Sequence, residues 1–227
     1  FGHSLENDGK KFIEAAGGSV VGTSRYPFPG NDFASYIVKA NSSKANAVAI
    51  ATAGLDLQNA IKQGREFGLG TGGQATVAML MSIMDVHGLG LKNAAGMMFA
   101  ESFYWDYDEE SRKFADKFMK KMKRMPTALH AGQYSAIRTY LKAVEQAKTD
   151  EVSEVIKAMK TMSINDAFAK NGKLRDDGKM VHDMFLVKVK TPAESKKPWD
   201  YYTVEEKVPG NDAFESLALS KCSLVKK

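Results

Sequence analysis

Helix-like and strand-like hydrophobic patterns alternate along the first hundred residues of this chain, and this alternation restricts the fold more than any other feature. Three apolar runs have the length of strands that are buried on both faces, at residues 47–51, 76–81 and 97–103. Amphipathic stretches with helical spacing precede or separate them, at residues 4–16, 32–43 and 56–67. The repeat of strand, turn and helix at roughly 25–30 residues predicts right-handed βαβ units and a mostly parallel sheet.

The beginning of the chain does not complete this pattern. The helix at 4–16 stops at Gly17 and Gly18 and is followed by an extended segment at 19–26, but no strand precedes it. The chain also starts at Phe1, without an initiator Met or a signal peptide. We therefore expect it to be a piece of a longer α/β protein.

The second half has a different organisation. Long amphipathic helices are predicted at 109–123 and 128–148, with a third at about 151–162, and short strands follow at 173–175, 182–190 and 199–205. The two long helices carry apolar stripes, which contain Phe114, Phe118 and Met122 on the first and Leu129, Tyr134, Ile137 and Leu141 on the second. We expect these stripes to need a surface that this chain does not supply. They would then pair with a missing N-terminal part or promote self-association.

Composition and charge argue against several classes of protein. The longest apolar run, at 77–81, is far shorter than the ~18 residues that span a bilayer. The net charge of +5 is modest and the lysines are scattered, so no nucleic-acid partner is expected. Cys222 is the single cysteine and cannot form a disulfide within the chain, so it either pairs outside the chain or is a free thiol.

No catalytic, metal-binding or cofactor-binding motif occurs with the flanking elements or residue spacing that it requires. Gly68, Gly70 and Gly73 match the glycine spacing of dinucleotide-binding loops, but a helix precedes them and a strand follows, which is the reverse of the required order. The histidines have no companion at metal-ligand spacing, and no nucleophile motif is present. We therefore expect a protein that is not an enzyme and has neither a metal nor a cofactor.

Three turns adjoin the C-terminal ends of predicted parallel strands, where open α/β sheets bind ligands. The first, at 1–4, opens a helix and contains Phe1 and His3. The second runs from Thr52 to Gly54, and the third, at 84–87, contains Asp85 and His87. Each has a structural alternative, namely an aromatic staple, a tight-turn glycine and a helix N-cap. Together they predict one ligand-binding edge of the sheet.

The densest aromatic cluster of the chain lies at 101–106 and includes Tyr104 and Trp105. Aromatic rings with a polar tip suit the wall of a ligand cleft. The alternative is a crossover segment that is packed between two lobes. The residues alone leave both interpretations open.

Several short motifs follow one another in an informative order along the chain. They are FGHSLE at 1–6, EAAGG at 14–18, DFASY at 32–36, AG at 53–54, NAIKQ at 59–63, ESFYWD at 101–106, PT at 126–127, GQYSA at 132–136, MVHDM at 180–184 and KPWDYY at 197–202. Their order resembles the leucine/isoleucine/valine-binding family of type I periplasmic binding proteins, and the resemblance covers nearly the whole chain.

This resemblance implies two Rossmann-like lobes joined by crossover segments, with the ligand held between them. Residues 1–103 would form the second lobe without its first strand, and residues 104–165 would be helices of an incomplete first lobe. Residues 166–227 would supply the last crossover and the closing strands of the second lobe. The fold class is then α/β, a Rossmann-like lobe with a mostly parallel sheet plus helices from a partner lobe.

The resemblance also implies positions for ligand contacts. The family's aromatic contact in the first turn of the second lobe falls on Phe1, and the turn after the AG step falls near Gly54, Leu55 and Asp56. The acidic residue that holds an amino group in amino-acid binders falls near Asp85. The hydroxyl pair that grips the ligand carboxylate belongs to the first lobe, outside this chain.

We therefore predict a periplasmic solute-binding component of an ABC importer, with a membrane permease as its partner. The ligand would be a small carboxylate, either an aromatic acid or a branched-chain or other amino acid. The alternatives are a ligand-sensing receptor domain of the same fold and an enzyme on an α/β scaffold. The predicted ligand-binding residues are Phe1, His3, Thr52, Gly54, Asp56, Asp85, His87, Tyr104 and Trp105.

Overall fold

The computed structural model describes residues 1–223 and 225, so residues 224, 226 and 227 lie outside the described residues. The described chain divides into two compact units. Unit 1 comprises Phe1–Ala100 and Val187–Thr203, and unit 2 comprises Glu101–Leu186 and the described residues from Val204 onward.

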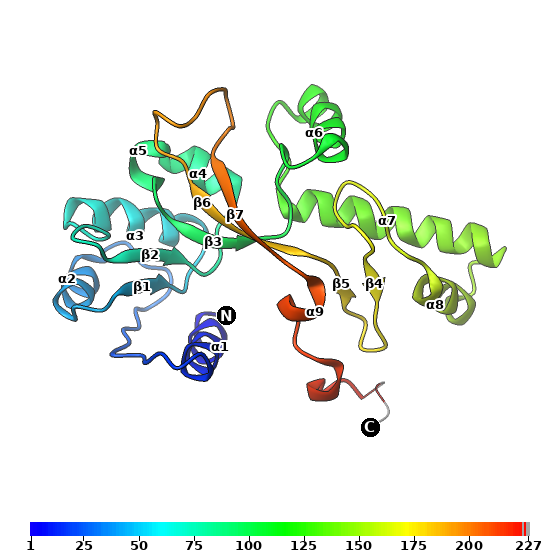
Figure 1. Ribbon diagram of the computed structural model, residues 1–227, viewed down its shortest axis with the longest axis horizontal. Helices are drawn as coiled ribbons and strands as arrows, with labels where there is room; N and C mark the ends of the chain where they lie inside the picture. The colour runs from blue at the N-terminus through cyan, green and yellow to red at the C-terminus, as the bar shows by residue number, and fades with distance from the viewer. Residues whose placement is uncertain (224, 226–227) are drawn as a thin grey trace. The chain divides into compact units, whose positions relative to one another are not determined.

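Unit 1 is built on three short parallel strands, which are β1 (Ala47–Ile50), β2 (Ala75–Ala78) and β3 (Met98–Glu101) (Figure 1). β1 and β2 pair in register from Ala47 opposite Ala75 to Ile50 opposite Ala78, and β2 pairs with β3 where Val77 faces Met98. The predicted parallel pairing is therefore confirmed. The prediction that the first strand is buried on both faces is wrong, because Ala47 and Ala49 of the edge strand β1 are exposed.

Helices precede and connect these strands. α1 (Gly2–Ala15) and α2 (Ala34–Ser42) come before β1, α3 (Gly54–Glu66) connects β1 to β2, and α4 (Ile83–Leu89) and the short α5 (Leu91–Ala94) lie between β2 and β3. Phe33 and Ile37 at α2 form a buried cluster with Ala60 of α3 and Leu69, and Val48 and Ile50 of β1 pack against it. The helical spacing of these apolar residues is what brings one face of each helix onto the sheet.

The start of unit 1 differs from the sequence prediction. The segment at 19–26 forms no strand, and α1 buries none of its residues, so that Phe12 and Ile13 are exposed. β1 is one of the two edge strands of the sheet among the described residues. A strand is stable only when its backbone N–H and C=O groups pair with a neighbouring strand. The segment at 19–26 forms no such pairing and stays irregular, although its composition favours a strand.

Two further strands, β6 (Met184–Val189) and β7 (Tyr202–Val208), extend the sheet in the order β1-β2-β3-β6-β7. The backbone N–H of Val189 donates to the carbonyl of Met97, and the N–H of Lys190 donates to the carbonyl of Tyr201. β7 begins three residues later than the predicted strand at 199–205 and ends later as well. The reason is that the aromatic run at 199–202 includes a turn, in which Trp199 has a positive φ of 68°.

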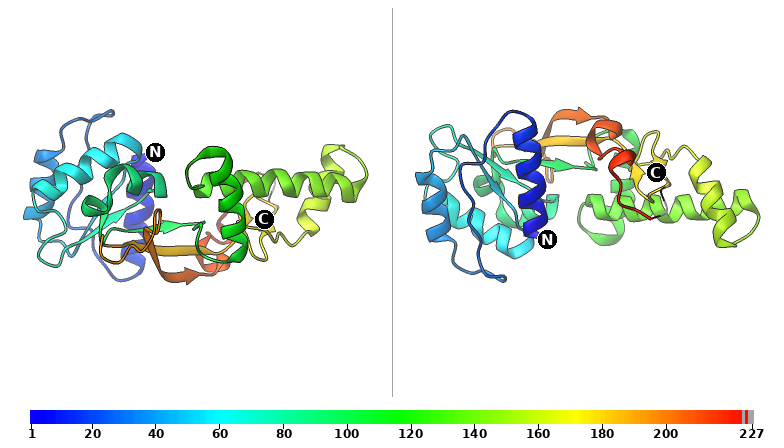
Figure 2. Two further views of the ribbon diagram at one scale, coloured as in Figure 1. Left: turned by 90° about the horizontal axis from the view of Figure 1, so that it is seen from above. Right: turned by 90° about the horizontal axis from the view of Figure 1, so that it is seen from below.

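Unit 2 contains α6 (Glu109–Met122), α7 (Ala128–Ala147) and α8 (Val152–Thr161), close to the predicted bounds. Figure 2 shows α8 lying beside the C-terminal half of α7. Ala143 of α7 packs there against Val155 and Ala158 of α8. The smaller elements are β4 (Lys173–Leu174), β5 (Met180–Val181), α9 (Gly210–Ala213) and the 3-10 turn η1 (Leu217–Leu219). β5, which the sequence did not reveal, pairs antiparallel with β4.

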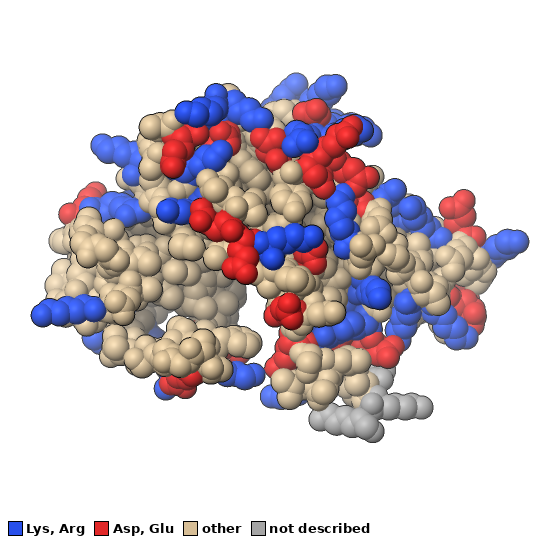
Figure 3. Space-filling view, viewed as in Figure 1, with Lys and Arg blue, Asp and Glu red and all other residues tan. Residues whose placement is uncertain are grey.

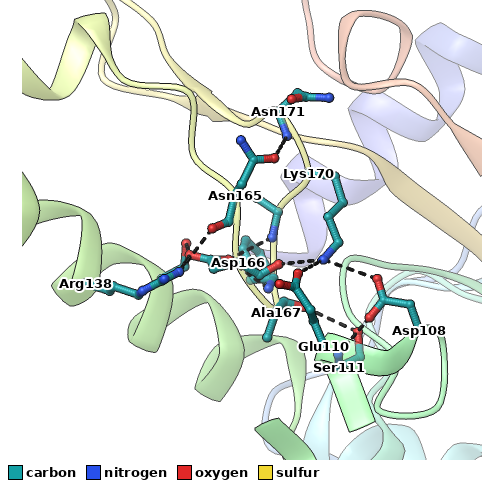
Figure 4. Close-up of polar contacts among 12 residues, drawn as sticks. Asp108, Glu110, Ser111, Arg138, Asn165, Asp166, Ala167, Lys170 and Asn171 are labelled. Carbon is teal, nitrogen blue, oxygen red and sulfur yellow. Dashed lines mark hydrogen bonds and ion pairs between the residues drawn. The ribbon is translucent and has the colours of Figure 1, made fainter. Parts of the chain in front are cut away.

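A buried carboxylate organises the loop that follows α8 (Figure 4). The hydroxyl of Ser135 on α7 donates to Asp166 Oδ2 at 2.7 Å, and both side chains are almost fully buried. Asp166 Oδ1 accepts the backbone N–H groups of Phe168 and Ala169 at 2.9 and 3.0 Å. Arg138 Nη1 lies 3.9 Å from Asp166 Oδ2. One acidic side chain therefore ties this loop to α7.

We predict that Asp166→Ala lowers the free energy of unfolding by about 3 kcal/mol, because three buried donors lose their acceptor together. Chemical denaturation followed by circular dichroism measures this change. Asp116→Ala, at an exposed aspartate of α6, is the control and should change stability by less than about 0.5 kcal/mol. Equal effects of the two substitutions would contradict the role given to Asp166.

Glu101, the last residue of β3, is a second buried acid. Burial raises the pKa of its carboxyl from the ordinary value of 4.5 to about 8, although the N–H groups of Ser102 and Phe103 oppose that shift. At neutral pH the folded protein therefore holds a proton that the unfolded chain releases. Between about pH 5 and pH 8 the folded state binds more protons, so its stability falls as the pH rises through this window.

We predict that Glu101 alone makes the free energy of unfolding fall by up to about 1.4 kcal/mol per pH unit in that window. Glu101→Gln should flatten this dependence, and the variant should be more stable than the wild type at pH 8. Urea denaturation at three pH values between 5 and 8 measures both effects. Glu145→Gln, at an exposed glutamate of α7, should keep the wild-type slope.

Candidate functional site

The C-terminal ends of β1 and β2 lie side by side at one edge of the unit 1 sheet. The backbone N–H of Met79 donates to the carbonyl of Ile50 at 3.1 Å, so the chain leaves both strands at the same level. The start of α1 reaches this edge too, because a Cβ on Gly2 would lie 3.1 Å from the carbonyl oxygen of Ala51. The structure therefore brings Phe1, the turn that follows β1 and the turn that follows β2 to one edge.

Gly54 starts α3 with a positive φ of 63°, which a residue with a Cβ adopts only under strain. A Cβ at this position would meet nothing within 4 Å, so the backbone here is open to approach. The preceding residue, Ala53, has no side chain that could cap the first N–H groups of the helix. The N-terminus of α3 is thus approachable, and no side chain caps it.

Thr52 and Asp56, by contrast, face the interior of unit 1. The hydroxyls of Thr52 and Tyr26 lie 2.5 Å apart. Asp56 Oδ2 accepts the backbone N–H of Gly30 at 2.9 Å and also interacts with the Tyr26 hydroxyl. Burial raises the pKa of Tyr26, and the neighbouring Asp56 adds to that rise. Both predicted site residues therefore hold the loop at 26–30 in place.

Asp85 lies in the first turn of α4, where it forms a capping box with Ser82. Asp85 Oδ2 accepts the backbone N–H of Ser82 at 3.0 Å and its hydroxyl at 2.8 Å. Asp85 Oδ1 accepts the side-chain amide of Gln58 on α3 at 3.1 Å. The carboxylate therefore starts α4 and joins it to α3.

His87 belongs to an aromatic group on the other side of α4. Its ring stacks on Trp199 with the centroids 4.0 Å apart and the planes 9° from parallel. Its Nδ1 lies 2.9 Å from the hydroxyl of Tyr201. These contacts attach the segment between β6 and β7 to α4. His3, in the first turn of α1, is exposed.

Tyr104 and Trp105 belong to unit 2, where both are almost fully buried and meet edge to face at 6.1 Å. Tyr104 lines a small depression of about 20 Å³, together with Phe103, Tyr107 and Phe185. Two lysines also line it. Lys207 pairs with Asp183 at 2.7 Å, and Lys170 pairs with Asp108 at 3.3 Å and with Glu110, so the charges are balanced locally.

A wider depression of about 650 Å³ in unit 1 lies along residues 23–25 and the start of α2. Its two basic residues are engaged, because Arg25 pairs with Glu6 at 2.8 Å and Lys39 donates to the carbonyl of Thr23. This hollow is not at the strand ends. The strand-end edge is the better candidate for a ligand-binding site, because several elements converge there.

Leu80 is a residue at this edge that the sequence reasoning did not single out. Leu55 lies in the turn that the family resemblance places near the ligand, although it was not among the predicted ligand-binding residues. Leu55 is 74% exposed in the first turn of α3, and Leu80 is 50% exposed two residues after β2. Phe1 is 70% exposed. A signal for Leu55 was present in the sequence, since it is out of phase with the buried stripe of α3 that contains Leu57 and Ile61.

Other kinds of site find no support in the described part of the chain. None of its groups of His, Cys, Asp and Glu has three members placed to hold a metal ion. None of its helices combines the length and apolarity that a bilayer crossing requires. On the face drawn in Figure 3, basic and acidic side chains are interspersed.

Comparison with known proteins identifies the family of the chain. Residues 1–197 match the family model described as periplasmic binding protein. A periplasmic binding protein from Burkholderia mallei is 44% identical with a TM-score of 0.92, and the match covers 100% of this chain and 60% of that one. A branched-chain amino acid ABC transporter periplasmic ligand-binding protein from Burkholderia xenovorans is 38% identical with a TM-score of 0.90, and covers 97% and 59%.

A solute-binding protein of an ABC transporter from Rhodopseudomonas palustris, solved in complex with 4-hydroxybenzoate, is 20% identical with a TM-score of 0.77. The match covers 90% of this chain and 56% of that one, and it shows the fold alone. No curated protein sequence matches the chain. The chain spans about 60% of the length of the solved structures that it matches. The resemblance seen in the sequence motifs is confirmed, and the chain belongs to the periplasmic binding protein family, whose members in ABC transporters are periplasmic.

Proposed function

We propose that this chain is the larger part of a solute-binding component of an ABC importer and that it delivers its ligand to a membrane permease. The ligand is a small carboxylate, an aromatic acid or an amino acid, and it is bound without covalent chemistry. The observation that carries this proposal is the strand-end edge of unit 1. Phe1, the N-terminus of α3 and the turn after β2 converge there around open space at Gly54.

The names of the similar proteins support the proposal without deciding the ligand. One is called a branched-chain amino acid transporter component and another was solved with 4-hydroxybenzoate. The exposed ring of Phe1 suits either an aromatic ring or an aliphatic side chain.

We further propose that α6, α7 and α8 belong to a first lobe that is completed by residues outside this chain. The support is the outer face of α7, where large apolar side chains are exposed. Leu129 is 84% exposed, Ile137 51% and Leu141 59%. Exposed apolar surface of this extent on one helix is characteristic of an interface. In this proposal the final segment, from 166 onward, returns the chain to the lobe that residues 1–103 begin.

The binding proposal predicts that the full-length protein is stabilised by its ligand. At a ligand concentration of 100 times Kd the stabilisation is about 2.7 kcal/mol, which a thermal-shift screen of amino acids and aromatic acids detects. Phe1→Ala should weaken binding of the best ligand at least tenfold. The matched control is Phe12→Ala, at an exposed phenylalanine near the other end of α1. Equal affinities of the two variants would remove Phe1 from the site.

The lobe proposal predicts that the isolated 227-residue chain self-associates through the outer face of α7. Ile137→Lys and Leu141→Lys should each shift the population toward monomer in sedimentation velocity, because they place a charge on the apolar face. Gln146→Lys adds the same charge at an exposed position outside this face and serves as the control. A wild-type chain that sediments as a single monomeric species would count against the proposal.

A further inference from the structure

The carboxylates at the strand-end edge of unit 1 are engaged with the protein itself. Asp56 accepts the N–H of Gly30, and Asp85 accepts three donors, which are the N–H and hydroxyl of Ser82 and the amide of Gln58. An ammonium group on a ligand would need an ionised acceptor that is free to turn toward it. Neither aspartate meets that condition.

α4 has little freedom to present Asp85 differently. Ile83, Val86 and Leu89 are all buried and fix the face of the helix that meets the core. Gln58 ties the same carboxylate to α3, and a Cβ on Gly88 of α4 would lie 3.1 Å from the Gln58 side-chain oxygen, so the two helices are closely packed. Turning Asp85 toward a ligand would break the capping box and this link between the helices together.

The side chains that remain accessible at this edge are apolar. Phe1, Leu55 and Leu80 are each at least half exposed, although large aliphatic and aromatic residues are usually covered in a folded domain. They come from three different elements, the start of α1, the first turn of α3 and the turn after β2. These elements meet where Gly2 approaches Ala51 and where Met79 bonds to Ile50.

We infer that this edge binds the uncharged, apolar body of an organic acid that has no amino group, and that Asp85 positions α4 against α3 instead of pairing with a ligand ammonium. This inference rests on the proposed function, since it names the class of ligand for the same site. In this inference Leu55 and Leu80 contact the apolar body of the ligand and thereby favour apolar ligands.

Isothermal titration of the full-length protein with matched probes tests the inference. The pairs are 3-phenylpropionate with L-phenylalanine and 4-methylpentanoate with L-leucine, which differ only by the amino group. The better of the two acids should bind at least tenfold more tightly than its amino-acid partner. Leu55→Asn and Leu80→Asn should each weaken that acid at least tenfold. Phe67→Asn alters an exposed side chain at the far end of α3, roughly 18 Å away along the helix, and should change affinity less than threefold.

Asp85→Asn should lower the melting temperature and leave the affinity for the acid within threefold. If that variant does not fold, Asp85→Glu replaces it. Glutamate is a usual capping-box residue at this position, so stability and affinity should both stay near the wild-type values. Tighter binding of an amino acid, with at least a tenfold loss in Asp85→Asn, would overturn the inference and leave the proposed function intact. Failure of all four probes to bind would overturn both.

Discussion

The parallel hydrogen-bonded ladder between β1 and β2 is the constraint on which the rest of unit 1 depends. Because the two strands pair residue for residue, they end at the same level, and α3 and α4 begin at one edge. The start of α1 lies at that edge too, where Gly2 closely approaches Ala51. Antiparallel pairing would have sent the two turns to opposite edges, and no common site would exist.

The polar side chains at this edge are in position for a ligand but are not available to bind one. Thr52, Asp56 and Asp85 all lie where a ligand would be expected, yet each is committed to a neighbouring loop or helix. A buried or half-buried carboxylate needs such donors, because leaving it unpaired would be costly. What remains accessible is the open backbone at Gly54 and exposed apolar side chains such as Leu55.

In unit 2 the buried polar groups are also paired, but part of the apolar surface is exposed. Asp166 serves Ser135 and two backbone N–H groups at once, so the loop after α8 is held firmly. The outer face of α7 has no equivalent cover among the described residues, and Leu129 and Leu141 are exposed there. The chain spans about 60% of its solved relatives, and in the lobe proposal residues outside this chain cover the face.

Hydrophobic periodicity in the sequence determined that unit 1 has short parallel strands, that long helices follow, and that Phe1 and Gly54 reach the strand ends. Motif order determined the family. Periodicity carries this information because it reports which face of each element is buried. Only the tertiary structure decided that 19–26 would stay irregular, that Tyr104 and Trp105 are buried in unit 2, and which donors Asp85 accepts. Those outcomes depend on partners distant in the chain, such as Gln58 for Asp85 and Trp199 for His87, and no local pattern specifies them.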